Sequence, residues 1–114
     1  MADGMDVFAA LDGVLKQRRK APADESYVAS LYARGLNKIL EKVGEEATEV
    51  ILAAKDNADG DDPDALVNEV ADLWFHTMVL LASQDLSSSD VVACLNGRFG
   101  LSGHEEKASR TQHT

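Results

Sequence analysis

The chain of 114 residues has few of the residues that build disulfide-linked folds. It contains one cysteine, Cys94, two prolines, one tryptophan, two tyrosines and three phenylalanines. One cysteine cannot form an intrachain disulfide, and no apolar run approaches the roughly 20 residues that a transmembrane helix requires. The N-terminal segment has no basic residues ahead of its apolar ones, so it does not resemble a secretory signal. The composition predicts a cytoplasmic protein with no membrane partner.

Basic residues are also scarce, and the formal net charge is -9. From Glu41 to Asp72 there are eleven acidic residues and two basic ones, a net of -9, whereas the rest of the chain has nine of each. An acidic segment of this kind repels a phosphate backbone, which argues against a DNA- or RNA-binding protein. Concentrated acids either form a solvated face or hold a divalent cation, and their spacing has to distinguish the two.

Apolar residues recur at three- and four-residue steps, and the two-residue alternation of strands is absent. This pattern predicts an all-α fold of four to five helices. Gly35 predicts a bend or stop between two helices. Asp62 and Pro63 predict a helix start, with Asp as N-cap and Pro as the first helical residue. The helices are expected near residues 5–20, 25–34, 36–56, 63–84 and 87–99.

Residues 1–100 are expected to form a single domain, and residues 101–114 a polar C-terminal tail. A domain of this size leaves a large share of its surface in water and has a thin core. We therefore expect an antiparallel helical bundle that is completed by dimerisation, with a second copy of the chain as partner.

The central helix contains the acidic pattern Glu45-Glu46-x-x-Glu49. At about 100° per residue, Glu46 and Glu49 share one shoulder of the apolar stripe with Lys42, whereas Glu45 points nearly opposite the core. The apolar stripe of this helix is expected to consist of Leu36, Ile39, Leu40, Val43, Ala47, Val50, Ile51 and Ala54.

The next helix contains the matching pattern Glu69-x-x-Asp72. Glu69, Asp72 and His76 share one shoulder of its stripe, and Trp74 lies at one edge. Two helices joined by a short loop pack antiparallel, so the acidic shoulders are expected to meet at the rim of the contact. The stripe of this helix is expected to consist of Leu66, Val70, Leu73, Thr77, Leu80 and Leu81.

Four carboxylates gathered at one rim raise each other's pKa and oppose folding unless something compensates their charge. Mg²⁺ is suited to this task, because it prefers oxygen ligands and retains waters and substrate phosphates. Paired carboxylates at i and i+3 on two helices are a known way to build metal sites in bundles. The alternative is that these acids are exposed residues of ordinary amphipathic helices, and the spacing alone leaves both interpretations open.

Two further residues on the acidic shoulders are candidates for substrate binding. Lys42 could balance the site's charge or contact a phosphate oxygen, or it could be a solvated lysine. His76 could hold substrate or donate a proton, or it could be a structural histidine. The chain has no Gly-rich phosphate loop, no Cys/His zinc spacing and no serine nucleophile motif. Water activated by a metal ion is then the simplest chemistry.

The segments YARGLNKILEKVGEEATEVILAAK, LVNEVADLWFHTMVLL and GLSGHEEKASR resemble bacterial phosphoribosyl-ATP pyrophosphatases. The resemblance spans about residues 11–110. The ExxE…ExxD pattern is shared across the all-α (MazG-like) NTP pyrophosphatase superfamily, so alone it indicates only metal-dependent pyrophosphohydrolysis. The flanking KVGEEATE, NEVADLWFH and SGHEEKASR segments indicate the phosphoribosyl-ATP branch.

The resemblance implies hydrolysis of phosphoribosyl-ATP to phosphoribosyl-AMP and pyrophosphate, the second step of histidine biosynthesis, by a homodimer. It implies Mg²⁺ ligation by Glu46, Glu49, Glu69 and Asp72. Either Glu45 or Glu49 could act as the catalytic base. Two alternatives stay open: a house-cleaning (d)NTP pyrophosphatase of the same superfamily, and a non-catalytic helical dimerisation module.

Basic residues near the C-terminus are further candidates for substrate binding. Arg98, Lys107 and Arg110 flank a Gly/Ser-rich stretch of an otherwise acidic protein. We expect the tail to close over the anionic substrate and to supply these cations, as mobile lids do. The alternative is a C-terminus with no role in binding.

Overall fold

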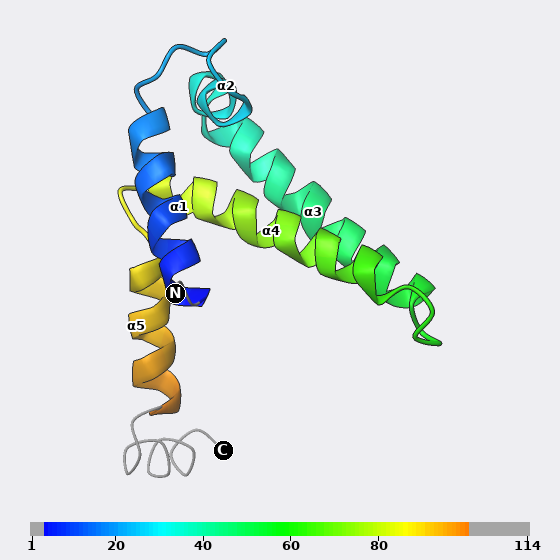
Figure 1. Ribbon diagram of the computed structural model, residues 1–114. Coiled ribbons are helices and arrows are strands. Elements are labelled where there is room, and N and C mark those ends of the chain that lie inside the picture. Colours follow the sequence, from blue (N-terminus) through cyan, green and yellow to red (C-terminus); the bar gives the residue numbers. More distant parts are fainter. Residues whose placement is uncertain (1–3, 101–114) are drawn as a thin grey trace.

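The structure is a computed structural model that describes residues 4–100. These residues form five helices and no strand, so the predicted all-α fold is confirmed. Each predicted helix boundary lies within two residues of the observed one. The helices, labelled in Figure 1, are α1 (Gly4–Arg18), α2 (Tyr27–Arg34), α3 (Leu36–Asp56), α4 (Pro63–Ser83) and α5 (Ser88–Phe99).

The predicted helix signals act as expected. Gly35 separates α2 from α3 with a φ of 94°, a conformation that favours glycine because it has no Cβ. The side chain of Asp62 accepts a hydrogen bond from the backbone N–H of Ala65, at 3.3 Å, and Pro63 opens α4. At the start of α5, the backbone N–H of Ser87 donates to the carboxylate of Asp90, at 2.9 Å. Local side-chain chemistry therefore sets the ends of the elements.

The hydrophobic core lies where α1 and α2 meet α3 and α4. Its largest fully buried side chains are Leu15 of α1, Leu31 of α2, Ile39 of α3 and Val79 of α4. Ile39 lies in the first half of α3 and Val79 in the second half of α4, so the core covers one end of the α3–α4 hairpin. The other end of the hairpin extends away from α1 and α5 (Figure 1).

Helices α3 and α4 share the most extensive contact between helices in the described part of the chain. By length and composition, α4 is also apolar enough to cross a membrane. It packs along α3 and presents Glu69 and Asp72, and its buried residues are His76, Met78, Val79 and Ala82.

The face of α3 that packs against α4 differs from the predicted stripe. Leu36, Leu40 and Ile51 were expected in the contact but are 46%, 45% and 62% exposed. Ile39, Val43, Ala47 and Val50 of the predicted stripe are covered, and the covered positions at alternating four- and three-residue steps also include Glu46 and Ala53. The prediction was wrong for Leu36, Leu40, Ile51 and Ala54, because a wheel drawn over all apolar residues averages two faces, one against α4 and one that is exposed. The real contact face is turned toward the acidic shoulder.

Candidate active site

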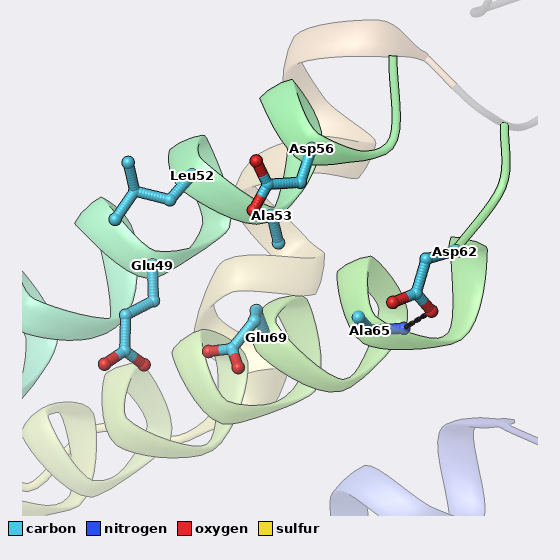
Figure 2. Close-up of a pocket in the computed structure, with 7 residues that line it drawn as sticks. All are labelled: Glu49, Leu52, Ala53, Asp56, Asp62, Ala65 and Glu69. Atoms are coloured by element: carbon cyan, nitrogen blue, oxygen red, sulfur yellow. Dashed lines mark hydrogen bonds between the residues drawn. The ribbon is translucent and has the colours of Figure 1, made fainter. Parts of the chain in front are cut away.

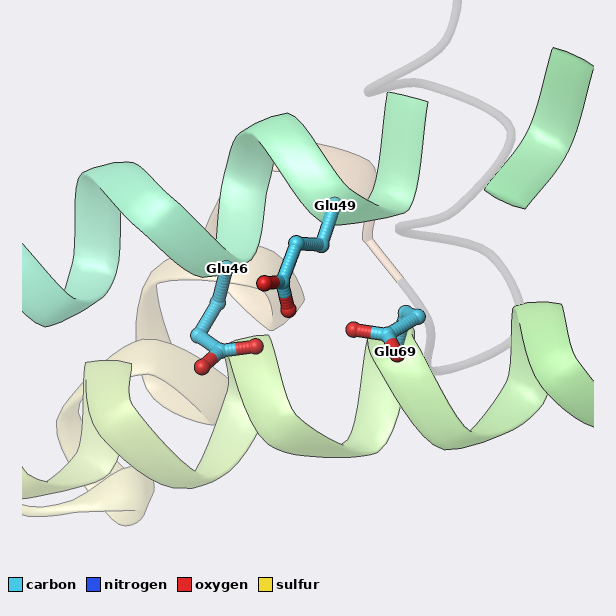
Figure 3. Close-up of side chains that lie close together, drawn as sticks. All are labelled: Glu46, Glu49 and Glu69. Carbon is cyan, nitrogen blue, oxygen red and sulfur yellow. The ribbon is translucent and has the colours of Figure 1, made fainter. Parts of the chain in front are cut away.

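Three of the four predicted metal ligands lie together between α3 and α4. One carboxylate oxygen from each of Glu46, Glu49 and Glu69 lies within 4.8 Å of the others. Figure 3 shows Glu46 and Glu49 reaching from α3 toward α4, with the Glu49 carboxylate between those of Glu46 and Glu69. We call these three residues the carboxylate cluster. Two carboxylates from one helix and one from its neighbour offer converging oxygen ligands.

The members of the carboxylate cluster differ in exposure. Glu46 is only 7% exposed, Glu69 is half-buried and Glu49 is exposed. The prediction placed all four acids at the rim of the helix contact, and for Glu46 this is wrong, because the rotation of α3 carries its side chain into the contact. The cluster therefore runs from the interior at Glu46 to solvent at Glu49.

Asp72, the fourth predicted ligand, is exposed and supplies no oxygen to the three-residue group. It lies one turn beyond Glu69 on α4, and its charge acts on both Glu46 and Glu69. The structure thus places Asp72 beside the cluster rather than within it.

Two oxygens of the cluster lack the partners that buried oxygens normally have. Glu46 Oε2 and Glu69 Oε2 are buried, and neither has a hydrogen-bond partner among the described residues. Lys42 Nζ lies 3.9 Å from Glu46 Oε1, which is the other oxygen of that carboxylate. Burying an unpartnered carboxylate oxygen is costly, and native structures rarely tolerate it. A hard divalent cation would compensate both oxygens, so the donor set fits Mg²⁺.

The crowding also changes how the carboxylates bind protons. Burial raises the pKa of Glu46 above its ordinary value, the charges of Glu49 and Asp72 raise it further, and His76 opposes them. For Glu69, the side-chain contact with Glu49 is the largest cause of a raised pKa, followed by burial. Without a cation, the folded protein therefore resists full ionisation of the cluster.

We expect Glu46→Gln to raise the melting temperature of the metal-free protein by a few degrees at about pH 7 to 8. The folded state holds the Glu46 proton more tightly than the unfolded chain, so the unfolding free energy falls as pH rises from 4.5 through the raised pKa. Glutamine does not ionise and avoids that loss. Below pH 4.5 both states are protonated, and the two proteins should melt alike. Thermal melts of both proteins in EDTA across this pH range measure the effect. An equal difference in melting temperature between the two proteins at every pH would contradict this account.

Both ring nitrogens of His76 are engaged within the protein. The side chain is 6% exposed. Its Nδ1 lies 2.9 Å from the backbone oxygen of Asp72, and its Nε2 lies 2.8 Å from the hydroxyl of Tyr27. The acidic pattern of the sequence predicts His76 as a substrate-binding candidate but not Tyr27. No periodic signal links Tyr27 to the acidic pattern, because it lies on a different helix, and only the packing of α2 on α4 brings the two together.

The other predicted residues of α3 lie beside the cluster. Lys42 makes ion pairs with Glu45, at 3.6 Å, and with Glu46, at 3.9 Å, so it lies at the inner end of the cluster. Glu45 is exposed and supplies no oxygen to the cluster, in line with its predicted direction. Lys42 therefore has the better position for contact with an anionic ligand.

Of the three basic residues predicted near the C-terminus, only Arg98 is described, and it is not brought to the cluster. Arg98 lies in the last turn of α5, where its side chain donates to the sulfur of Cys94 at 3.6 Å. Helix α5 packs on α1 and points away from the α3–α4 hairpin (Figure 1). Lys107 and Arg110 lie outside the described residues.

A cavity of about 290 Å³ opens beside the carboxylate cluster, between the free halves of α3 and α4. Figure 2 shows Glu49 and Glu69 at one end of it and Asp56 and Asp62 near the interhelical loop. Small-molecule sites usually have volumes of about 300–1,000 Å³, so this cavity has room for part of a nucleotide. The lining residues are Glu49, Leu52, Ala53, Asp56, Asp62, Ala65 and Glu69.

The chain is similar to known proteins over nearly its whole length. The family model described as phosphoribosyl-ATP pyrophosphohydrolase matches residues 8–99, which include the whole cluster. A phosphoribosyl-ATP pyrophosphatase of Hydrogenovibrio crunogenus is 56% identical over 108 residues, covering 95% of this chain and 96% of the relative. One of Methylococcus capsulatus is 56% identical over 106 residues, covering 93% and 97%. The chain therefore belongs to the phosphoribosyl-ATP pyrophosphohydrolase family.

Proposed function

We propose that this protein hydrolyses phosphoribosyl-ATP to phosphoribosyl-AMP and pyrophosphate, the second step of histidine biosynthesis, with Mg²⁺ held at the carboxylate cluster. The observation that supports this most directly is the pair of buried, unpartnered oxygens of Glu46 and Glu69 beside an open cavity. The two relatives described above carry the same activity in their names.

The proposal assigns the cluster residues to metal binding and Lys42 to phosphate binding. Glu46, Glu49 and Glu69 would hold Mg²⁺, with Asp72 close by. When bound, Mg²⁺ supplies charge neutralisation for the polyphosphate and lowers the pKa of water. Lys42, beside Glu46, offers a cation to a phosphate oxygen.

Two glutamates are candidates for the catalytic base. Glu49 is exposed and lines the cavity, so it can accept a proton from water beside the substrate. Glu45 lies outside the cluster and is ion-paired with Lys42 at 3.6 Å. We therefore assign the base to the carboxylate oxygen of Glu49 that would not hold Mg²⁺, and a charge-balancing role to Glu45.

The proposal includes a homodimer. Among the described residues, thirteen large hydrophobic side chains are exposed, whereas eight hydrophobic residues are buried. On α3, Leu36, Leu40 and Ile51 lie within about 60° of one direction and form one exposed apolar stripe. An exposed stripe beside a thin core is the surface that a second copy would cover. The net charge of -9 favours a protein without nucleic-acid partners, and the exposed free thiol of Cys94 suits a reducing cytoplasm.

A substrate panel tests this function. With Mg²⁺, we expect kcat/KM for pyrophosphate release from phosphoribosyl-ATP to be at least about a hundredfold higher than from ATP, dATP or the other common (d)NTPs. The reason is that a site built to hydrogen-bond one substrate rejects analogues that lack the matching groups. EDTA should abolish release. Equal turnover of several (d)NTPs would instead support the house-cleaning alternative.

The same preparation separates an enzyme from a scaffold. A ligand bound only by the folded state at a hundred times its dissociation constant stabilises it by about 2.7 kcal/mol. Mg²⁺ should therefore raise the melting temperature of the wild type, and Glu69→Gln should remove most of that increase. A protein with neither activity nor a Mg²⁺-dependent melting shift would be a dimerisation module.

A further inference from the structure

Tyr27 and His76 join two helices next to the carboxylate cluster. Tyr27 is the first residue of α2, and its hydroxyl lies 2.8 Å from Nε2 of His76 on α4. The two rings meet edge to face, with centroids 5.8 Å apart and an interplanar angle of 84°. Phe75 also packs edge to face on His76, with centroids 5.1 Å apart. The imidazole is thus held by ring contacts as well as by hydrogen bonds.

The direction of the hydrogen bonds follows from the partners. The backbone oxygen of Asp72 can only accept, so Nδ1 of His76 carries the proton. In the neutral imidazole, Nε2 is then an acceptor, and the Tyr27 hydroxyl donates its single proton to it. The Tyr27 oxygen can then only accept a further hydrogen bond. With a neutral imidazole, His76 therefore makes Tyr27 a hydrogen-bond acceptor toward any further partner.

Tyr27 is half-exposed and lies near the charged groups of the cluster. The residue is 51% exposed, although its hydroxyl end packs on a buried histidine. Burial raises the pKa of Tyr27; Lys42 opposes the increase, while Glu46, Glu45 and Asp72 add to it. Those charged groups all belong to or border the cluster, so the hydroxyl lies within their electrostatic reach and stays protonated.

We propose that Tyr27 is a substrate-positioning residue that accepts a hydrogen bond from a sugar hydroxyl of the bound nucleotide, and that His76 holds Tyr27 in this role. This inference rests on the proposed function. An acceptor suits a hydroxyl donor and not a phosphate oxygen, which has no proton at neutral pH. If the polyphosphate lies on the carboxylate cluster, the ribose attached to the α-phosphate is the nearest part of the substrate with hydroxyl groups.

Tyr27→Phe tests the contact because it removes the hydroxyl and keeps the ring. We expect KM for phosphoribosyl-ATP to rise roughly three- to tenfold, the effect of one neutral hydrogen bond. The value of kcat should change by less than about twofold, because a contact made equally in substrate and transition state affects binding alone. Calorimetry with Mg²⁺ present should show the same loss of affinity for phosphoribosyl-AMP, which is the product and is not turned over.

Two replacements of His76 separate positioning from a merely structural role. The amide of asparagine reaches about as far as Nδ1, so His76→Asn should keep the bond to Asp72 but leave Tyr27 without its acceptor. The amide of glutamine reaches about as far as Nε2, so its oxygen can accept from Tyr27. We expect His76→Asn to match Tyr27→Phe in KM, and His76→Gln to restore much of the loss.

Tyr32→Phe is the matched control, because Tyr32 also joins α2 to α4, through its hydroxyl and the backbone oxygen of Val79 at 3.4 Å. Its KM should equal that of the wild type. To identify the donor, AMP, 2′-deoxy-AMP and 3′-deoxy-AMP are compared as inhibitors. The wild type should bind one deoxy form more weakly than AMP, and Tyr27→Phe should not distinguish them. Unchanged KM and affinity in Tyr27→Phe, or equal discrimination by both proteins, overturns the inference. A wild type that does not hydrolyse phosphoribosyl-ATP overturns the proposed function instead.

Discussion

Replacing Glu46, Glu49 or Glu69 by glutamine is expected to slow pyrophosphate release from phosphoribosyl-ATP by at least about a hundredfold, the order of effect seen when one member of a catalytic set is removed. The three carboxylates converge within 4.8 Å, so each supplies charge and geometry to the same cation. Loss of one leaves an incomplete set, and a double variant should therefore lose little more than a single one. Steady-state kinetics at saturating Mg²⁺ measures this.

Glu41→Gln is the matched control, because Glu41 lies on the same helix and pairs with Lys38 at 3.3 Å, outside the cluster. It should keep wild-type activity. Asp72→Asn tests whether Asp72, the fourth predicted ligand, also binds the cation. If it slows pyrophosphate release as much as Glu69→Gln does, Asp72 contacts the cation in the loaded enzyme. Substantial Mg²⁺-dependent activity in two of the three cluster variants would show that these acids do not form a metal site. All variants should retain their helical circular dichroism, since glutamine keeps the side-chain shape.

Placing an aspartate on the exposed apolar stripe of α3 is expected to abolish the dimer and to lower the melting temperature by roughly ten degrees. In an isolated protomer, Leu40 and Ile51 are 45% and 62% exposed, and changing such a residue costs no more than about 0.5 kcal/mol. In a dimer the same positions would be buried, and an unpaired charge there would cost several kcal/mol. Sedimentation velocity and thermal melts of Leu40→Asp and Ile51→Asp distinguish the two cases.

Asn37→Asp is the control for these variants. It adds the same charge about one turn before Leu40, at an exposed position near the start of α3. A negative charge near a helix N-terminus is favourable, so this variant should remain dimeric and stable. If Leu40→Asp and Ile51→Asp behave like Asn37→Asp, a second copy does not cover this stripe.

The bounds of the helices could be predicted from the sequence because local chemistry determines them. Gly35 adopts a φ of 94° that other residues avoid, and Asp62 caps α4 through its own side chain. Signals of this kind depend on neighbours within about four residues, so a single sequence contains them completely. The convergence of Glu46, Glu49 and Glu69 was also predictable, since helical periodicity and a short interhelical loop are enough to bring two acidic shoulders together.

The errors concern contacts between elements. The rotation of α3 depends on which of its two apolar faces α4 covers, and composition does not distinguish them. For the same reason Glu46 was expected at the rim and lies in the interior. The pairing of Tyr27 with His76 depends on how α2 docks on α4, across 49 residues of sequence. Whether Arg98 contacts the substrate likewise depends on how α5 lies relative to the cluster, within one chain or between two copies. This contact remains a prediction.

The whole carboxylate cluster lies within one helical hairpin, and this has a consequence for the order of folding. Contacts between α3 and α4 span a short loop, so their closure costs little chain entropy and can precede the docking of α1, which is distant in sequence. If the hairpin closes first, Glu46 and Glu69 come together before the rest of the core is complete, and their repulsion opposes that step. A divalent cation that relieves this repulsion would act on the nascent hairpin as well as on the finished enzyme. The rate at which newly made chains mature would then depend on the free magnesium concentration.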